Sequence, residues 1–300
     1  MLNIVGHKKI WFALSAVLVG LALLAIVSYG FKESAEFKGG SLWEFKIPVS
    51  QPSLAVVQSE FSNTLHIPDA VISYDSGNQE FLATFSTADE ATHQQYLTIL
   101  NNTWPSFQEL TFESISPSIG AGLKNNAIIA IILVLIGISL YIAYAFRKAS
   151  RPISSWKYGW ITLLTLFHDV SIPAGLLALL GHIQNVQIDS NFIVALLVVM
   201  GFSVHDTIVV FDRIRENLLA QRGKVPFEKI INDSVNQTLA RSINTSLTLI
   251  LVLLALYFAG PTDLRYFVLT LLVGVTTGIY SSIFIASPAL ALVSPKDAVK

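Results

Sequence analysis

Residues 191–212 read NFIVALLVVMGFSVHDTIVVFD. In helical form this stretch is about 33 Å long, and the hydrocarbon core of a bilayer is about 30 Å thick. Its ionisable residues are His205, Asp206 and Asp212. Ionisable side chains inside a membrane are expensive to bury and usually functional. The stretch therefore predicts a membrane-spanning helix that carries a functional acid at depth.

Five further apolar stretches are long enough to span a bilayer. Together they predict six transmembrane helices, at residues 10–29, 124–146, 159–181, 191–212, 238–259 and 265–287. The first stretch follows His7, Lys8 and Lys9 and so resembles a signal peptide. It is too long for an ordinary signal core, and no small-residue cleavage pattern follows it cleanly, so we expect a retained helix.

The composition favours a membrane protein and excludes several function classes. Of the 300 residues 53% are apolar and 13% charged, about half the charged share of a soluble domain, and the mean hydropathy is +0.60. A net charge of −1 gives no basic surplus for nucleic acid. The absence of cysteine excludes disulfides, thiolate catalysis and cysteine-built zinc sites, and no histidine cluster has metal-ligand spacing. We expect no metal and no cofactor.

The basic residues predict how the helices are oriented. If the spans alternate, about fourteen of the nineteen Lys and Arg residues fall on one side, and such residues gather in the cytoplasm. They are Lys8, Lys9, Arg147, Lys148, Arg151, Lys157, Arg213, Arg215, Arg222, Lys224, Lys229, Arg241, Lys296 and Lys300. We therefore expect a multi-pass protein of the cell membrane with both termini in the cytoplasm.

Residues 30–123, after the first span (1–29), predict a small domain outside the membrane. They carry eleven acids against three lysines and no stretch long enough to span. SLWEFKIPV, SLAVVQSEFSNTL, AVISYD, QEFLATFS, TADEATHQQYLTILNNTW and FQELTFESI follow in the order β-α-β-β-α-β. This order predicts a ferredoxin-like α+β domain that binds or acts as a lever. We expect Thr87 to cap its second helix, and His66 and His93 to lie at its surface.

Within the remaining residues, 124–300, the segment near 213–237 separates the fourth and fifth spans. Gly223 and Pro226 predict that it forms two short helices. Their apolar face would hold Leu218, Leu219, Phe227, Ile230 and Ile231. The pattern fits an amphipathic segment on the cytoplasmic membrane surface and equally an ordinary solvated helix pair.

Asp206 and Arg241 are the candidate proton-coupling residues. Each lies roughly 10 Å inside its span from the cytoplasmic end, so adjacent helices would hold the carboxyl group and the guanidinium at one level. Burial favours the neutral acid whereas a nearby arginine favours the carboxylate, which makes the protonation state sensitive to water and helix movement. A permanent ion pair that only joins two helices fits the same placement.

Asp169, His205 and Thr245 are candidate accessory residues. Asp169 follows His168 near the middle of the third span, and His205 precedes Asp206. The two histidines suit a proton relay, although a lone histidine in a span more often makes a hydrogen bond between helices. Thr245 is one of four hydroxyl residues that could hydrogen-bond across the interface, with Thr238, Ser242 and Ser246.

Two other features are expected to be structural. Asp212 lies beside Arg213 and Arg215, so we place it at the membrane surface. Small residues recur every four positions in the sixth span and permit close helix packing, which we expect within the chain rather than against a partner. They are Gly274, Gly278, Ser282 and Ala286.

Several stretches resemble the SecF family, the smaller membrane subunits of the SecD–SecF complex that assists protein translocation. GFSVHDTIVVFDRIREN (201–217) is similar to the family's fourth span and NQTLARSINTSLTLILVLLALYFAG (236–260) to its fifth. Three more stretches resemble its third span, the start of its outer domain and its return into the second span. They are LFHDVSIPAGLLALLG (166–181), FKGGSLWEF (37–45) and SPSIGAGL (116–123).

The resemblance implies proton-driven late export of unfolded polypeptide, with a SecD-like subunit and the Sec translocon as partners. It carries the family's fourth-span acid to Asp206 and its fifth-span arginine to Arg241. The sequence departs from the family pattern at three positions. His205 stands in place of asparagine, Phe202 in place of tyrosine and Glu36 in place of aspartate.

The residues alone leave two other functions open. Asp169 and Asp206 on adjacent spans suit an intramembrane aspartyl protease, although the sequence has no GxGD motif and the estimated depths differ by several ångströms. A proton-driven exporter of small molecules is the second alternative. Such exporters have larger outer domains and twice as many spans, so this chain would be one half of one.

Overall fold

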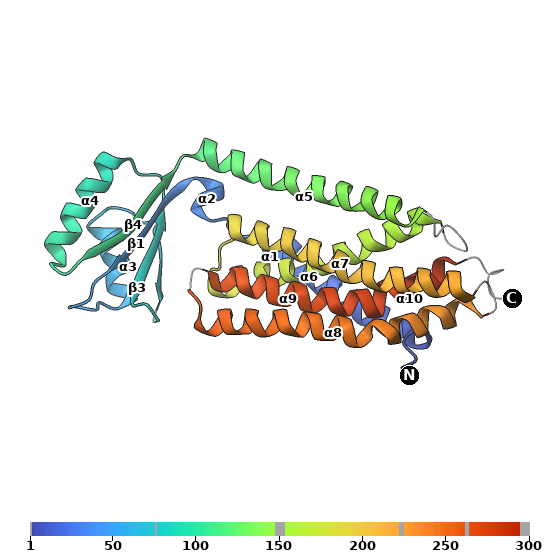
Figure 1. Cartoon of the computed structure of the whole chain (residues 1–300). Coiled ribbons are helices and arrows are strands. Elements are labelled where there is room, and N and C mark those ends of the chain that lie inside the picture. Colours follow the sequence, from blue (N-terminus) through green and yellow to red (C-terminus); the bar gives the residue numbers. More distant parts are fainter. Residues whose placement is uncertain (1, 76, 148–153, 222–224, 262–263, 295–300) are drawn as a thin grey trace. The chain divides into compact units, whose positions relative to one another are not determined.

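The computed structural model describes residues 2–75, 77–147, 154–221, 225–261 and 264–294. They form two compact units, which can be followed in Figure 1. The helical unit comprises residues 1–31, 129–186 and 191–300, and the α+β unit comprises residues 32–128 and 187–190.

Six helical segments in the described chain are long and apolar enough to cross a membrane, which confirms the six predicted spans. The first combines η1 (Val5–His7) and α1 (Lys8–Tyr29), and the next four are α5 (Pro117–Ala145), α6 (Ser155–Gln184), α7 (Ser190–Gln221) and α8 (Phe227–Ala259). The sixth combines α9 (Arg265–Ser281), η4 (Ser282–Ala286) and α10 (Ser287–Val293).

The α7 and α8 helices continue well past the predicted spans. The expectation of two separate short helices within 213–237 is therefore wrong, because these residues extend α7 to Gln221 and start α8 at Phe227. Phe227, Ile230 and Ile231 are buried inside the protein instead of lying on the membrane surface. Their apolar face packs on the helical core, which makes each long helix continuous. Gly223 lies outside the described residues.

Three spans form the interior of the helical unit. In α6, α7 and the sixth span 56%, 50% and 56% of the apolar stretch is buried, against 11% in α1, 6% in α5 and 17% in α8. Polar residues on α6, α7 and α9 are therefore enclosed by protein instead of lipid.

Glycine allows α9 to approach α7 closely. A Cβ atom on Gly274 would overlap the side chain of Val199, and one on Gly278 would lie 3.3 Å from the Cβ of Ser203. Small residues at such positions let two helix backbones come together. The small-residue stripe of the sixth span thus packs within the chain, as predicted.

The α+β unit has the predicted ferredoxin-like topology. Its elements are α2 (Ala35–Lys38), β1 (Gly40–Lys46), α3 (Leu54–Asn63), β2 (Val71–Asp75), β3 (Glu80–Phe85), α4 (Glu90–Thr103) and β4 (Gln108–Ile115). The strands lie in the order β2-β3-β1-β4, and every neighbouring pair is antiparallel. The short helix α2 adds to the predicted order.

Buried and less buried side chains alternate along β1, and the buried ones form the core of this unit. Trp43 and Phe45 point to one face of the sheet and are fully buried, with Phe61 of α3 and Leu100 of α4 against them. Successive side chains of a strand point to opposite faces, so this face takes the apolar residues of the strand.

The cap of α4 differs from the prediction. Asp89, and not Thr87, precedes the helix, and its side chain accepts a hydrogen bond of 2.9 Å from the backbone N–H of Thr92. A carboxylate satisfies a free N–H of the first turn as well as a threonine hydroxyl does. These hydrogen bonds lower the pKa of Asp89 below its ordinary value.

His93 is buried, although the sequence placed it at the surface. Its ring stacks on Phe112 with the two centroids 3.7 Å apart, and its Nε2 lies 2.6 Å from Oε2 of Glu109. The same Glu109 oxygen accepts a hydrogen bond of 2.9 Å from Nε1 of Trp43. This carboxylate therefore connects α4 with the core strand β1.

The segment between α6 and α7, residues 187–190, belongs to the α+β unit. The predicted boundaries of that domain, 30–123, did not include this segment. The backbone N–H of Ser34 donates to the carbonyl of Ile188 (3.0 Å), and the N–H of Ile188 donates to the carbonyl of Lys32 (2.7 Å). Glu36 accepts from the backbone N–H of Ser190 at 2.9 Å. Its carboxylate thus lies at the start of α7, where helix geometry favours a negative charge.

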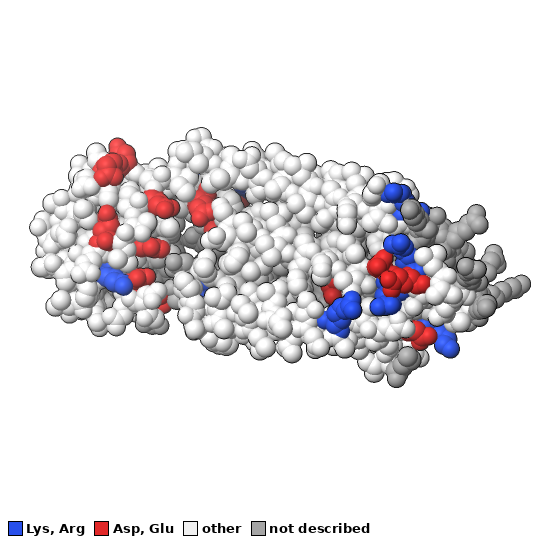
Figure 2. Space-filling view, in the orientation of Figure 1, with Lys and Arg blue, Asp and Glu red and all other residues white. Residues whose placement is uncertain are grey.

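On the face shown in Figure 2, most charged residues of the helical unit gather towards one end. Three ion pairs lie near the end of α7 and the start of α8: Lys8–Glu228 (2.7 Å), Arg213–Glu216 (2.9 Å) and Arg215–Asp212 (3.0 Å). Asp212 is therefore part of a charged helix end.

Candidate proton-coupling site

The interior of the helical unit holds two acids, Asp169 on α6 and Asp206 on α7. Asp169 is 0% exposed and Asp206 is 5% exposed. The two acids lie in one region, because Ser281 donates to Asp169 while the adjacent Ser282 contacts Thr207, the neighbour of Asp206. Within the described ranges neither acid forms an ion pair with a lysine or an arginine. The site thus holds two buried acids without an ion-pair partner from a lysine or arginine among the described residues.

Three polar side chains surround Asp169. Its Oδ2 accepts hydrogen bonds from the hydroxyl groups of Ser203 on α7 and Ser281 on α9, the latter at 2.7 Å. Its Oδ1 lies 2.8 Å from Nδ1 of His168. Three spans therefore meet at this carboxyl group, and each of its oxygens has a partner.

Asp206 is less completely satisfied. Its Oδ2 is buried and has no hydrogen-bond partner in the described part of the chain, and the same holds for the hydroxyl of Ser242 on α8. The hydroxyl groups of Ser242 and Ser282 lie beside the carboxyl group. A buried polar atom without a partner is costly. This oxygen needs a proton of its own or a donor brought to it.

The sixth span departs from α-helical geometry beside the two acids. After α9 ends at Ser281, residues Ser282–Ala286 form a π-helix. Ser281 donates to Asp169, and the Oγ of Ser282 lies 2.8 Å from Oγ1 of Thr207. Short π-helical turns within α-helices occur frequently at functional sites. Here the turn starts where two consecutive serines reach the acid-bearing helices.

Arg241, His205 and Thr245 lie on the surface of the helical unit. Among the residues that the structure describes, no hydrogen bond or ion pair joins Arg241 to Asp206. Ser242, the next residue, faces Asp206 instead. Because successive residues of a helix are about 100° apart, Arg241 lies on the adjoining flank of α8.

The sequence reasoning missed the hydroxyl groups that organise the site. The missed residues are Ser203, Thr207 and Ser281, and Ser282 was assigned to packing alone. A signal was present, because Ser203 and Thr207 flank Asp206 at positions that share the buried face of α7. Ser282 also belongs to the small-residue stripe, which brings the sixth span within hydrogen-bonding distance of α7.

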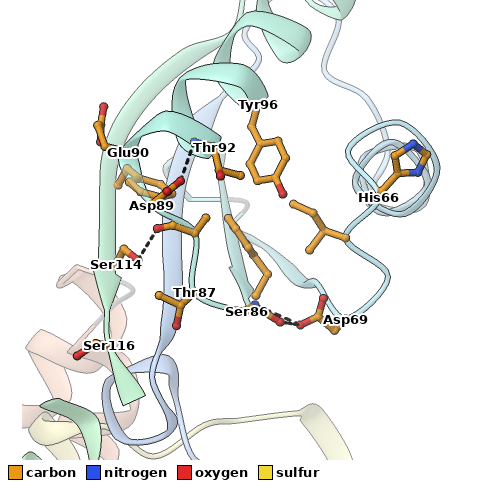
Figure 3. Close-up of a pocket in the computed structure, with 14 residues that line it drawn as sticks. His66, Asp69, Ser86, Thr87, Asp89, Glu90, Thr92, Tyr96, Ser114 and Ser116 are labelled. Atoms are coloured by element: carbon orange, nitrogen blue, oxygen red, sulfur yellow. Dashed lines mark hydrogen bonds between the residues drawn. The ribbon is translucent and has the colours of Figure 1, made fainter. Parts of the chain in front are cut away.

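The α+β unit holds a cavity of about 860 Å³ beside the start of α4, shown in Figure 3. Hydroxyl groups and acids from α4, β4 and the ends of β2 and β3 line it. Asp69 accepts a hydrogen bond from Ser86, and Asp89 accepts one from Thr92, as the dashed lines show. Its aspartates are thus engaged in holding the cavity's own walls.

Comparisons with known proteins identify the family. Residues 95–296 match the family model of the C-terminal region of the protein export membrane proteins SecD and SecF. The protein translocase subunit SecF of Thermobaculum terrenum is 38% identical, over 99% of this chain and 95% of that protein. SecF of Anaerolinea thermophila is also 38% identical, over 97% and 94% of the two chains. The chain belongs to the SecF family.

A solved structure agrees with this assignment. The crystal structure of SecDF, a translocon-associated membrane protein from Thermus thermophilus, matches with a TM-score of 0.84 and 32% identity. The match covers 97% of this chain and 38% of that chain. SecDF in its Super-membrane-facing form matches with a TM-score of 0.69. This SecF-family chain is therefore a multi-pass membrane subunit of a protein-export translocase, with a transport role instead of a catalytic one.

Proposed function

We propose that this chain uses the proton motive force to assist late steps of polypeptide export, with Asp206 taking up and releasing the proton. The observation that carries the proposal is the buried Oδ2 of Asp206, which has no partner among the described residues. An acid enclosed by three spans and left unsatisfied is suited to alternate between a proton and a cation.

Arg241 is the cation that we propose for this exchange. It precedes Ser242, whose hydroxyl lies beside Asp206, so a rotation of α8 by about 100° would exchange the serine for the guanidinium. Proton release from Asp206 would favour that rotation because the carboxylate then needs a positive partner. The membrane potential supplies about 2.3 kcal/mol per charge per 100 mV, enough to bias such an equilibrium.

His205 and Thr245 are accessory groups in this proposal. His205 lies on the surface of α7 next to Asp206. Thr245 lies one turn beyond Arg241 on the same exposed flank of α8. Both are placed where they can respond to water that reaches the site from the surface of the unit.

The flank of α8 that carries Arg241 supports the proposed partner. Its exposed residues include Gln237, Arg241, Asn244 and Thr245, a polar row at helical spacing. Polar side chains in a membrane face protein or water in preference to lipid. Because the SecDF relatives join two subunits in one chain, we propose that a SecD-like subunit covers this row.

We also propose a place for each part of the chain relative to the membrane. The α+β unit lies outside the cell membrane and acts on the emerging unfolded polypeptide, while both termini lie in the cytoplasm. The Sec translocon delivers the polypeptide, and lipid surrounds the apolar surfaces of α1 and α5, which are the least buried spans. The eleven acids of the outer domain against three lysines agree with the side that positive residues avoid.

Export measured in cells that depend on this chain tests the proposal. We expect Asp206→Asn and Arg241→Met to leave folding and membrane insertion intact and to reduce secretion of a reporter to the level seen without the chain. Asparagine keeps the size of aspartate but cannot exchange a proton, and methionine keeps the apolar stem of arginine without its charge.

Asp212→Asn is the matched control, because Asp212 lies on the same helix and pairs with Arg215 at its charged end. We expect this variant to secrete normally. Undiminished export by both Asp206→Asn and Arg241→Met would refute the proton-coupling role. Efflux of small molecules from reconstituted vesicles, without an export defect, would favour the small-molecule exporter instead.

Cysteine cross-linking tests the partner surface. In a chain without cysteine, Asn244→Cys on the polar row should form a cross-link to a co-expressed SecD-like subunit. Ile132→Cys on the exposed face of α5 is the control and should not. Equal cross-linking at both positions would show that the polar row is not a specific contact.

A further inference from the structure

We propose that His168 and Asp169 form a second proton-binding site in the helical unit, with Nε2 of His168 as the atom that takes the proton. This inference rests on the proposed function, because the second site acts through its coupling to Asp206. It assigns a role to a buried pair that lies apart from the flank of Arg241.

The groups around Asp169 are able to donate to a carboxylate. Its Oδ2 accepts from two serine hydroxyls, of Ser203 and Ser281. Its Oδ1 lies 2.8 Å from Nδ1 of His168, and the tautomer with its proton on Nδ1 would complete a set of three donors. A carboxylate with several donors is well stabilised by hydrogen bonds, but it still places a negative charge in the interior.

The other nitrogen of the His168 ring, Nε2, makes no hydrogen bond to a described residue, and it is buried. The aromatic ring of Tyr280 lies alongside it, with the centroids 6.0 Å apart. The Tyr280 hydroxyl is already engaged, because it donates to the carbonyl of Trp11 at 3.0 Å and lies 3.4 Å from the hydroxyl of Ser15. An acceptor lone pair at Nε2 is therefore available for a proton.

Proton binding changes the net charge of the His168–Asp169 pair. With the ring neutral and Asp169 ionised, the pair carries one negative charge. A proton from water that binds the Nε2 lone pair makes the ring an imidazolium and the pair neutral. Its return to water, or to an ionised Asp206, restores the negative pair. No covalent bond other than N–H changes.

The surroundings couple this pair to Asp206. Among the described residues, the titratable groups nearest the cluster are Asp206 on α7 and Tyr280 on α9, whereas His205 lies on the exposed side of α7. Ser281 binds Asp169, and its neighbour Ser282 lies beside Asp206, so one turn of the sixth span touches both acids. Two negative charges in one interior repel each other, so loss of a proton at one acid favours retention at the other.

Nitrogen NMR of the histidine rings tests the inference on the full chain in lipid bilayers. In the native protein we expect the His168 signals to change between their neutral and protonated values as the pH changes. In Asp206→Asn the midpoint of this change should move by on the order of one pH unit, because a neighbouring charge is removed. His168→Asn assigns the signals and keeps an amide donor toward Asp169.

The outcomes separate this inference from the proposed function. A ring that stays in one state throughout, or a midpoint that does not respond to Asp206→Asn, would overturn the second site whatever the export result. Normal export by Asp206→Asn would overturn the proposed function and leave the NMR coupling to stand by itself. Ser281→Ala removes a single donor from Asp169 and should also move the midpoint, which tests the second site if Asp206→Asn does not fold.

Discussion

Hydroxyl groups distinguish the two buried acids at the scale of single residues. Asp169 receives two serine donors and a histidine, so both of its oxygens are satisfied. Asp206 has serine hydroxyls beside it but keeps an oxygen without a partner among the described residues. This difference in donors, and not in burial, is the basis of the different roles that we propose for the two acids.

The cap of α4 gives a prediction about pH at this scale. Hydrogen bonds from Thr92 hold the pKa of Asp89 below its ordinary value of 3.8. Its carboxylate therefore stabilises the α+β unit above that value, and the stabilisation is lost as the pH falls through the lowered pKa. We expect the first turn of α4 to lose protection from hydrogen exchange in strong acid.

Asp89→Asn is the matched variant, because asparagine also caps helices but does not titrate. It should keep the protection at neutral pH and lose the acid-dependent part. Asp89→Ala should weaken protection at every pH. If the asparagine variant kept the full acid dependence, another group would be responsible for it.

At the scale of elements, the contact between α7 and α9 positions the site. Gly274 and Gly278 bring the helices together, and Ser281 and the π-helix that follows then reach Asp169 and Thr207. The contact is built from small residues because close approach of two helices leaves no room for larger ones.

Gly274→Ala tests this contact. Its new methyl group would overlap the fully buried Val199, and overpacking of this kind costs about 1–3 kcal/mol. We expect a lower midpoint of thermal unfolding in detergent. Gly137→Ala on α5 should leave the midpoint unchanged or raise it, because a Cβ atom there meets nothing within 4 Å.

Val199→Ala combined with Gly274→Ala should recover part of the lost stability, since the smaller residue makes space for the methyl group. Additive losses in the double variant would show that the two residues do not meet.

At the scale of the whole molecule, charge and apolar length determine how the chain crosses the membrane. The charged end of α7 carries the ion pairs of Arg213 and Arg215, while the α+β unit carries an excess of acids. This asymmetry predicts opposite sides for the two regions.

Single cysteines report these sides, because the natural chain has none. A thiol reagent that does not cross membranes should label Asn101→Cys on α4 in intact cells. It should label Leu219→Cys, which lies on the exposed surface of α7, only after the membrane is opened. The reverse pattern would contradict the proposed orientation.

The sequence by itself determined the number of spans, the ferredoxin-like order of strands and helices, and the family. These properties follow from local patterns, because the length of an apolar run and the alternation of a strand are set by neighbouring residues. The same patterns led to errors where long-range packing decides, as for the continuous helices of 213–237 and the burial of His93.

Only the tertiary structure decided which groups surround each acid. Depth along a helix placed Asp206 and Arg241 at one level, but it does not specify which side of α8 faces α7. Rotation about the helix axis is fixed by packing between spans, and here it turns Ser242 toward Asp206 and leaves Arg241 on the adjoining flank. Ser281 reaches Asp169 for the same reason, because contacts between distant segments determine it.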